Sequence, residues 1–586
     1  MSSGSSVERR HEVVEKGSPT ELEQVHTAEK VPGHDNYYEK DGLRTYGDGL
    51  DHDHEPKMTF KRFMSLVSMA LLWTGSQIPV YLYGGAPPYI YGDIGGSDRW
   101  TWFIIANLLA LAAVCPFVGS ISDLIGRRYV AMIGASFLVI GNIIGATAKS
   151  MNIFIAGHVF MGAGAGINEL TALAAASEMA PTRKRGTYIA ALIFTIIPFV
   201  PSVLYAQLIC YYATWRYIGL FCGVWAFVGL LGIAFFYFPP PRVNSAGLSR
   251  KQVIAEIDFI GGFLSISGMI LFMMGLQWGG SQYKWATVHV LVPLILGALI
   301  LIVFAVWEAK WAKHPMFPHR LKQNPRVLAL TLVITFISGA NFFAVLMFWP
   351  TQAFNVYGHD PVGIGLRGLP IGLAIMTGAC VVLVLISVLR GQIRALMVAS
   401  SVLMTAGCGA MAIGETDNMH QLWGILVLAG LGIGGILVPA SIITTIICPD
   451  DLIATVAALT LAIRVIGGVI GYSVYYNVFV NKFTENAKFY IGGLMVTKLG
   501  IYDVDLITEV IELTGASQTD EIAHLPGLDN PVVHAAIVKA GQIAFAASYK
   551  FVYYASIPFG VLCIFAAAFL GDISKYMDDH VAVVIT

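Results

Sequence analysis

The sequence predicts an all-α membrane protein, and three observations support that fold class. First, 56% of the 586 residues are hydrophobic and only 12% are charged, whereas a soluble domain carries about a quarter charged residues. Second, the apolar residues gather in blocks of about twenty or more, the length at which a helix crosses a hydrocarbon core about 30 Å thick. Third, the Lys and Arg residues of the links between these blocks are distributed unequally between the two sides.

The first 60 residues are predicted to form a disordered cytoplasmic tail. They are polar and lack the apolar core that a secretory signal needs. The run Asp51-His52-Asp53-His54-Glu55 could in principle hold a metal, but we interpret it as solvated sequence. The seven cysteines of the chain show neither metal-ligand spacing nor a disulfide framework. We therefore expect no metal and no other cofactor.

Fourteen apolar blocks predict fourteen transmembrane helices in a 6+2+6 arrangement. Six helices form an N-terminal half (61–240), two are inserted with cytoplasmic loops (241–326), and six form a C-terminal half (327–571), followed by a short cytoplasmic tail (572–586). The blocks lie at about 63–84, 100–121, 129–148, 153–178, 187–210, 216–238, 259–279, 288–309, 328–350, 362–389, 393–413, 422–447, 453–480 and 550–570. An even number of crossings places both termini on one side.

The charges of the links decide which side that is, because Lys and Arg accumulate in short cytoplasmic loops. With the N-terminus in the cytoplasm, the inside loops hold fifteen Lys and Arg residues and the short outside loops hold five. Both termini are therefore predicted to be cytoplasmic. The last outside loop, about 481–549, is too long for the charge rule, and we expect it to form a small extracellular cap with some helix of its own.

An internal repeat supports the division into two halves. A shift of 268 residues places Gly162, Gly164 and Gly166 on Gly430, Gly432 and Gly434, each set inside an apolar block. The same shift aligns Pro181 with Pro449 and brings Arg127 within one position of Arg394. The shared spacing predicts two six-helix halves related by duplication, as in many transporter folds. Because these glycines lie within helices, close helix packing explains them better than nucleotide binding.

The link between the second and third helices carries the most specific motif. The run Gly119-Ser120-Ile121-Ser122-Asp123-Leu124-Ile125-Gly126-Arg127-Arg128 resembles the signature loop of the major facilitator superfamily. In that family the small residue lets helices approach closely, the Asp caps a helix and pairs with charge across the halves, and the arginines hold the cytoplasmic gate. The resemblance assigns this gate motif to Gly119, Asp123, Gly126, Arg127 and Arg128. The alternative is a tight turn with ordinary cytoplasmic arginines.

The resemblance extends over nearly all of the chain after residue 60. Trp215-Arg216 opens the sixth helix and Gln277-Trp278-Gly279-Gly280 closes the seventh. With fourteen helices, these features resemble the fungal subgroup that contains trichothecene efflux pumps and siderophore-iron transporters. The resemblance implies proton-linked movement of a sizeable organic molecule across a membrane. Its expected partners are that small molecule, protons and the lipid bilayer. Since the net charge is only −1, we expect no nucleic-acid partner.

Three titratable residues inside apolar blocks are candidates for proton coupling or substrate binding. His158 stands where related drug transporters usually have an arginine implicated in proton coupling, and a histidine can itself exchange a proton near neutral pH. Glu169 follows eleven residues later, so the two lie about 20° apart around a helix and share a face. Arg464 could neutralise an anionic substrate or pair with Glu169. Such groups usually face the bundle interior, and purely structural contacts are the alternative for all three.

Further residues could line a cavity for a large, partly apolar solute. These candidates are Trp73, Gln77, Tyr81, Gln207 and Asn341. Aromatic residues in such helices more often pack against neighbours or lie at the membrane interface.

Export of a toxin or other secondary metabolite, driven by a proton gradient, is the first functional hypothesis. The fifth helix carries Ile197-Pro198-Phe199-Val200-Pro201 and lacks the glycine-rich pattern of many proton-antiporting relatives, so the direction of transport stays open. The alternatives are a proton-coupled importer of ferric siderophores, a transporter-like sensor and a membrane enzyme. The sequence contains no GxxxxGK[ST], HExxH or GxSxG motif, so ATP drive and these hydrolase chemistries lack support. We expect a monomer in the plasma membrane, with a vacuolar or vesicle membrane as the alternative.

Overall fold

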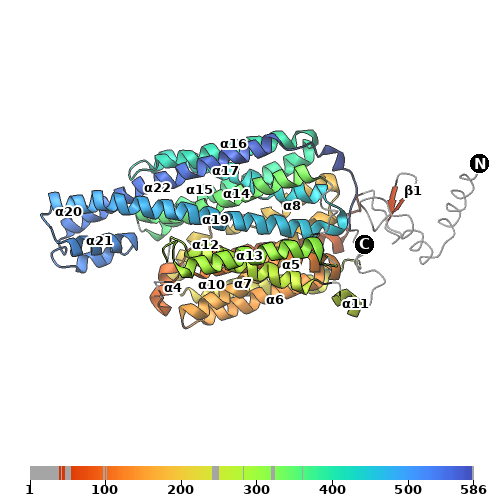
Figure 1. The fold of residues 1–586 in the computed structure, drawn as a ribbon, viewed down its shortest axis with the longest axis horizontal. Helices are drawn as coiled ribbons and strands as arrows, with labels where there is room; N and C mark the ends of the chain where they lie inside the picture. The colour runs from red at the N-terminus through yellow and green to blue at the C-terminus, as the bar shows by residue number, and fades with distance from the viewer. Residues whose placement is uncertain are drawn as a thin grey trace, which may run out of the picture.

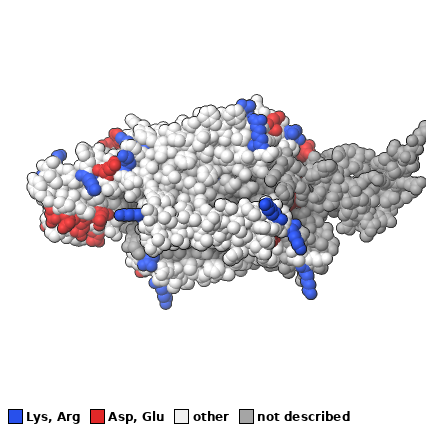
Figure 2. Space-filling model, viewed as in Figure 1, with Lys and Arg blue, Asp and Glu red and all other residues white. Residues whose placement is uncertain are grey.

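The computed structural model is an elongated bundle of helices (Figure 1). It describes residues 38–40, 43–45, 55–96, 99–100, 102–240, 250–255, 257–280, 283–313, 315–317, 324–358 and 360–583. Thirteen helices in these ranges are long and apolar enough to cross a membrane. The middle of the bundle presents a surface almost without charge, and the Lys, Arg, Asp and Glu side chains in view gather toward its two ends (Figure 2). The apolar surface is the one that lipid would cover.

The first helices form one bundle, which we define as the N half. Its helices are α3 (Phe60–Gly84), α4 (Pro87–Ile94), α5 (Trp102–Ile125), α6 (Arg127–Thr147), α7 (Met151–Met179), α8 (Arg185–Phe194), α9 (Ser202–Tyr212) and α10 (Arg216–Phe236). Among the spans, α7 is the most buried and packs against α3, α5 and α6. The short helix α11 (Arg250–Ala255) follows, and then the inserted pair α12 (Phe259–Trp278) and α13 (Val288–Lys310).

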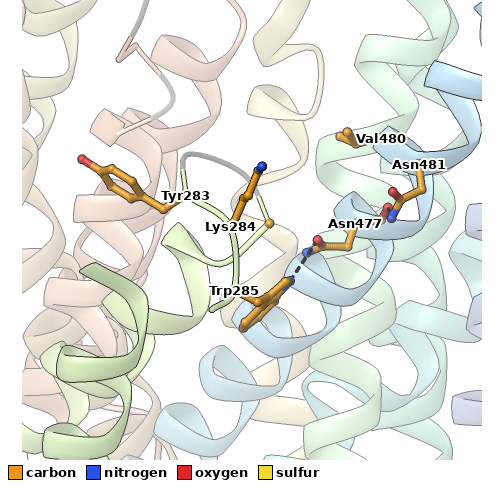
Figure 3. Close-up of a pocket in the computed structure, with 7 residues that line it drawn as sticks. Tyr283, Lys284, Trp285, Asn477, Val480 and Asn481 are labelled. Carbon is orange, nitrogen blue, oxygen red and sulfur yellow. Dashed lines mark hydrogen bonds between the residues drawn. The ribbon is translucent and has the colours of Figure 1, made fainter. Parts of the chain in front are cut away.

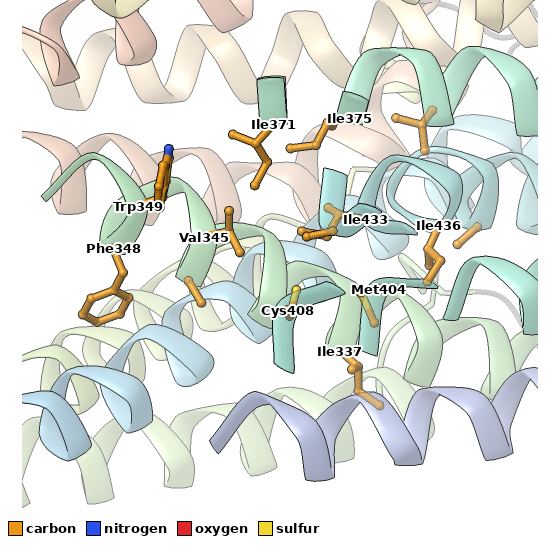
Figure 4. Close-up of a cluster of buried hydrophobic side chains, with 14 of the residues drawn as sticks. Ile337, Val345, Phe348, Trp349, Ile371, Ile375, Met404, Cys408, Ile433 and Ile436 are labelled. Atoms are coloured by element: carbon orange, nitrogen blue, oxygen red, sulfur yellow. The ribbon is translucent and has the colours of Figure 1, made fainter. Parts of the chain in front are cut away.

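The later helices form a second bundle, which we define as the C half. Its helices are α14 (Pro325–Tyr357), α15 (Pro361–Val388), α16 (Ile393–Ala410), α17 (Met419–Leu437), α18 (Pro439–Ile447), α19 (Ile453–Ala487) and α22 (Pro531–Ala568). Buried apolar side chains from α14, α15, α16 and α17 meet in its core, among them Val345, Ile371, Met404 and Ile433 (Figure 4). The inserted helix α12 packs against both halves, on α5 and on α19.

The repeat glycines lie at equivalent contacts in the two halves. Gly162 and Gly166 of α7 face the backbone of α5, and Gly164 faces the backbone of α6. In the C half, Gly430 and Gly434 of α17 face α15, while Gly432 faces α16. At each position a methyl group would collide with a neighbouring helix, so glycine permits the close approach. The geometry agrees with the packing role predicted for these glycines.

The fifth predicted helix is not continuous. Residues 187–210 were expected to form one helix, but α8 ends at Phe194, a 3₁₀ turn follows at Ile197–Phe199, and α9 begins at Ser202. Pro198 and Pro201 explain the break, because proline has no N–H to donate and clashes with the preceding turn of a helix. The prediction of one continuous helix is therefore wrong. A count of fourteen crossings stays a prediction, since it requires α8 and α9 to cross together.

The last two long helices extend well past their predicted ends. Helix α19 continues to Ala487 instead of ending near 480, and α22 begins at Pro531 instead of near 550. Between them lie a π turn (Lys488–Gly492), α20 (Gly493–Thr497), α21 (Val504–Gly515) and a 3₁₀ turn (Thr519–His524). We call residues 481–549 the cap and the end of the bundle that carries it the cap end. It projects beyond the bundle at the left of Figure 1.

The opposite end carries the 119–128 motif, and we call it the gate end. The segments just before α3 and just after α22 both make contacts there. Glu55, just before α3, accepts a hydrogen bond from Tyr188, and Val583, after α22, donates one to the Glu178 carbonyl. Most of the predicted disordered tail at 1–60 lies outside the described residues. Within it, however, β1 (Tyr38–Lys40) pairs antiparallel with β2 (Leu43–Thr45), and residues 55–59 lead into α3.

Candidate functional site

Asp123 joins the two halves at the gate end. Its carboxylate, at the end of α5, accepts hydrogen bonds from the amides of Ala454 (3.3 Å) and Thr455 (2.8 Å) and from the Thr455 hydroxyl (2.7 Å). These amides belong to the first turn of α19, where N–H groups lack partners within their own helix. A carboxylate there is also favoured by the helix dipole. Asp123 of the N half thus caps a helix of the C half.

Arginine side chains surround this contact on the N-half side. Arg127 is fully buried and pairs with Asp123, with Glu178 at the end of α7, and with the Ser122 hydroxyl (2.9 Å). Arg128 instead turns to α10, where it donates to the Ala234 carbonyl (3.0 Å) and lies 3.8 Å from the centre of the Phe238 ring. The charges of Asp123, Glu178 and Arg127 compensate one another, as buried charges require.

Two glycines shape the motif. A methyl group at Gly119 would lie 2.5 Å from Cβ of Ala458, so a side chain there would push α5 away from α19. Gly126 has φ +106°, in the region that favours glycine, and it begins the turn from α5 into α6. Of the five predicted motif residues, Gly119 and Asp123 lie near the end of α5, Gly126 forms the turn, and Arg127 and Arg128 begin α6. Gly119 and Asp123 contact α19 of the C half, Arg127 supports Asp123, and Arg128 contacts the N half.

A second bridge between the halves was not predicted from the sequence. Arg185, at the start of α8, donates to the Thr445 carbonyl and pairs with Asp450 at 3.1 Å. Arg185 is 1% exposed, and Asp450 belongs to the 3₁₀ turn (Asp450–Leu452) before α19. The repeat that aligns Pro181 with Pro449 was a usable signal, because both partners closely follow these prolines. Asp123 and Arg185 thus each join the two halves at the gate end.

An ion pair joins the halves deeper in the bundle. Arg464 of α19 donates to one Glu169 oxygen, and Gln77 of α3 donates to the other at 3.0 Å. Glu169 is 5% exposed and Arg464 is 8% exposed. Removing one partner of such a pair leaves an uncompensated buried charge, at about 3–5 kcal/mol. The structure therefore brings together two of the three predicted titratable residues, on helices from different halves.

Two of the predicted cavity residues lie beside this pair. Gln77 and Tyr81 are partly exposed, one turn apart on α3, and the Tyr81 hydroxyl lies 3.5 Å from Oε1 of Gln77. Trp73, one turn further along, is 5% exposed, and its Nε1 has no hydrogen-bond partner within the described structure. The side chains of Gln77, Tyr81, Glu169 and Arg464 form a polar patch that we call the central cluster.

His158 lies apart from the central cluster. Its ring is fully buried among Tyr83, Phe103 and Phe154, with centroid distances of 5.0, 4.8 and 4.4 Å, and its Nδ1 lies 3.0 Å from the Phe154 carbonyl. Eleven residues of helix place it about 16 Å along the axis from Glu169. The Nε2 atom has no partner among the described residues. The predicted proton role of His158 stays a prediction.

The remaining two cavity candidates make local contacts. Gln207 donates to the Gly85 carbonyl at 2.6 Å and so ties α9 to the end of α3. Asn341 is 1% exposed and accepts a hydrogen bond from the Tyr475 hydroxyl at 2.9 Å, within the C half. Neither contact includes a residue of the central cluster.

A cavity of about 370 Å³ opens toward the cap end (Figure 3). It lies between the turn that joins α12 to α13 and the later part of α19. Its lining residues are Gly280, Tyr283, Lys284, Trp285, Asn477, Val480 and Asn481. The Trp285 indole donates to the Asn477 side chain at 3.3 Å, which ties the inserted pair to the C half. None of these residues was predicted as a site from the sequence.

Comparisons with known proteins agree on one family. The sequence profile of the family described as "Fungal trichothecene efflux pump (TRI12)" matches residues 63–586. The trichothecene efflux pump TRI12 of Fusarium sporotrichioides is 24% identical over 507 residues, 85% of this chain and 83% of the relative. The efflux pump FUS6 of Gibberella moniliformis is 26% identical over 432 residues, 72% and 75% of the two chains.

Two further similarities concern a shorter match and the fold. The MFS-type transporter gkaD of Penicillium citrinum is 26% identical over 388 residues, and the chain spans 65% of that relative's length. Among solved structures, a double-tryptophan mutant of XylE matches with a TM-score of 0.53 at 13% identity, over 88% of this chain and 98% of that one. A second structure, titled as the proton:xylose symporter XylE, matches with a TM-score of 0.50 at 13% identity, over 84% and 95%. At this identity the structural likeness shows the major facilitator fold alone.

Proposed function

The chain belongs to the fungal trichothecene efflux pump family of major facilitator transporters, and from that premise we propose that it exports a toxin or other secondary metabolite in exchange for protons. The substrate is a small organic molecule, and the protein acts as a monomer in the plasma membrane. The gate end faces the cytoplasm and the cap faces outward. Predicted loop charges support this orientation, because the links at the gate end carry the larger number of Lys and Arg residues.

One observation carries the proposal: the Glu169–Arg464 ion pair is buried and its partners come from different halves. In transporters of this architecture the halves rock about a central site, so that the site opens to one side at a time. Protonation of Glu169 removes its charge and so weakens its attraction to Arg464. A substrate that hydrogen-bonds to Gln77 or Tyr81 competes for the same polar atoms. Proton and substrate therefore act on one bridge between the halves.

The proposal is tested by efflux of labelled toxins from cells that express the protein, with and without a protonophore. We expect expressing cells to accumulate less toxin and a protonophore to abolish that difference. Glu169→Gln should lose gradient-driven efflux while retaining exchange of labelled for unlabelled substrate. Glu485→Gln changes a carboxylate that is 66% exposed in the cap and should behave as wild type. If Glu169→Gln exports with the wild-type response to pH and protonophore, Glu169 is not the coupling residue.

His158 is the competing candidate for proton coupling. If it carries the proton, His158→Ala should change the pH dependence of transport, whereas Glu169→Gln should leave it unchanged. If His158 only fills its aromatic surroundings, His158→Ala should lower thermal stability and leave the pH profile unchanged. Both variants are compared at equal surface expression.

Import of ferric siderophores is the second candidate, because the 370 Å³ cavity lies toward the cap end, beyond the central cluster. Iron-dependent, protonophore-sensitive accumulation of a labelled ferric siderophore would favour it over export. A chemically altered compound in the same assay would instead indicate an enzyme. Signalling without flux would indicate a sensor.

A further inference from the structure

The segment after α22 begins as part of the C half. The Arg326 side chain of α14 donates to the Phe569 carbonyl at 2.9 Å, and Gly571 lies against Val327 of α14. Ile573 is fully buried and Met577 is 5% exposed. The Tyr576 hydroxyl donates to Asn324, just before α14, at 2.8 Å. Residues 569–577 are therefore anchored to the half from which they emerge.

The next six residues cross to the N half. The Asp578 carbonyl accepts from the Arg183 amide at 2.9 Å, and the His580 carbonyl accepts from the Thr182 amide at 2.9 Å and from its hydroxyl at 3.2 Å. The Val583 amide then donates to the Glu178 carbonyl at 3.0 Å. These partners lie in the last turn of α7 and in the 3₁₀ turn (Thr182–Lys184) that joins it to α8. Backbone hydrogen bonds at Asp578, His580 and Val583 thus hold the segment along its length.

The side chain of His580 contacts the C half, opposite to its backbone contacts with the N half. It is 3% exposed, and its Nε2 lies 2.7 Å from Oδ2 of Asp450, in the C half. The other Asp450 oxygen accepts from Arg185 of the N half at 3.1 Å. One carboxylate thus holds both the second bridge between the halves and the crossing segment. The segment is also linked to the Asp123–Arg127 pair, since Glu178, whose carbonyl binds the Val583 amide, pairs through its side chain with Arg127.

We propose that residues 578–583 form an autoinhibitory strap that holds the gate end closed. The strap is rooted in the C half and bonded to the N half at the end where Asp123 and Arg185 also bridge the halves. The gate end cannot open unless the hydrogen bonds from the strap to residues 178–183 break or residues 569–577 leave the C half. Release of the strap is therefore a step that precedes opening, separate from any event at Glu169.

A native cysteine reports whether the gate end is open. Cys448 lies two residues before Asp450, is partly buried, and packs against a hydrophobic cluster formed by the N half and α19. Burial raises the pKa of its thiol well above the ordinary value, so it reacts slowly with maleimides while the gate end is closed. A variant that keeps Cys448 as its one cysteine isolates the signal. The six replaced residues are Cys115, Cys210, Cys222, Cys380, Cys408 and Cys563.

The experiment measures the rate of Cys448 labelling by a small maleimide in the purified full chain, without substrate. Deletion of residues 578–586 should raise that rate about tenfold, because several hydrogen bonds that exist only in the closed state are lost. His580→Ala should raise it by a smaller factor. Lys575→Ala, at an exposed position of the same tail, and deletion of 584–586 alone should leave it unchanged.

Wild-type labelling rates in both the 578–586 deletion and His580→Ala would overturn the strap. If the deletion variant does not fold, as judged by gel filtration and thermal melting, His580→Ala decides alone. The strap rests on the proposed function only for the expectation that the gate end opens. If the variants label faster but the protein exports nothing, the strap is supported and the proposed function is overturned. If the protein exports but the variants label at the wild-type rate, the proposed function is supported and the strap is overturned.

Discussion

Two contacts between the halves at the gate end are related by the 268-residue repeat, and they differ in chemistry. In one, α5 meets the first turn of α19, and the Asp123 carboxylate caps the Thr455 amide. In the other, α15 meets the first turn of α8, and the Ser387 hydroxyl accepts from the Thr187 amide at 3.2 Å. Thr187 and Thr455 are separated by the repeat shift itself. The same backbone position is thus capped by a charged group on one side and a neutral group on the other.

The difference shows that duplication preserved the packing but not the electrostatics. Asp123 is 4% exposed and Thr455 is 1% exposed, while Thr187 lies at the surface. A charge-assisted hydrogen bond is about twice as strong as a neutral one, and burial protects it from water. We therefore expect the α5–α19 contact to dominate closure of the gate end, and the α15–α8 contact to guide packing.

The largest expected effect is that of Asp123→Asn. The amide side chain keeps the size of the carboxylate but loses its charge, so Arg127 and the first turn of α19 lose their anionic partner. Charged hydrogen bonds contribute about 1.5–3 kcal/mol each, so we expect transport to fall about tenfold or more. Flux at equal surface expression is the measurement, with melting temperature as the check on folding. Wild-type flux would remove Asp123 from the gate.

Ser387→Asp in the Asp123→Asn background should recover part of the loss. It places a carboxylate beside the Thr187 amide, at the first turn of α8, where a helix dipole favours negative charge by about 0.3–1 kcal/mol. We expect a two- to fivefold gain in flux over Asp123→Asn alone, about what that energy gives. Ser387→Asn is the matched uncharged variant. Equal flux for the two would mean that the charge does not matter on this side.

Ser387→Ala should have a smaller effect. One neutral, exposed hydrogen bond is lost, which contributes about 0.5 kcal/mol, the low end of the range for neutral bonds. Because the α15–α8 packing around Gly186 is unchanged, flux should fall less than about threefold. A loss as large as that of Asp123→Asn would contradict the ranking of the two contacts.

The smallest expected effect concerns Glu55, which pairs with Lys184 beside the same end of α8. Burial raises the pKa of Glu55, but hydrogen bonds from Lys184 and Tyr188 outweigh it and keep the pKa below the ordinary 4.5. The stabilisation from the Glu55–Lys184 pair is therefore fully present above about pH 4.5 and is lost as the pH falls through the lowered pKa. Both partners are partly exposed, so Glu55→Gln should change stability by about 1 kcal/mol or less at neutral pH. A larger change in melting temperature would show that the segment before α3 has a stronger role.

The sequence was sufficient for the fold class and for much of the site. Block length and charge bias predicted the helical bundle, and the repeat predicted the glycine contacts. The Glu169–Arg464 pairing was one of the alternatives open for Arg464, because buried charges need partners. The break in the fifth helix was not predicted, because a helix interrupted by Pro198 and Pro201 has the same apolar composition as a continuous one.

The strap could not be derived in the same way. Its hydrogen bonds to residues 178–183 are mostly between backbone atoms, which carry no side-chain pattern. The length of α22 was also underestimated, because its first turns are amphipathic rather than uniformly apolar. Contacts of this kind depend on where two distant segments meet in space. Hydropathy does not encode that.

The cap is an extension of α19 and α22, so it should move together with the C half. Phe483 lies against Gly515, Asn486 of α19 hydrogen-bonds to Ser548 of α22 at 2.9 Å, and α21 rests on α22 at Gly541. The 19 residues of α22 from 531 to 549 extend about 28 Å at 1.5 Å per residue. A rotation of the C half by about 10° would swing such an arm by about 5 Å at its tip. A pair of spin labels, one on α21 and one on the N half, would therefore read the tilt of the molecule from outside the membrane.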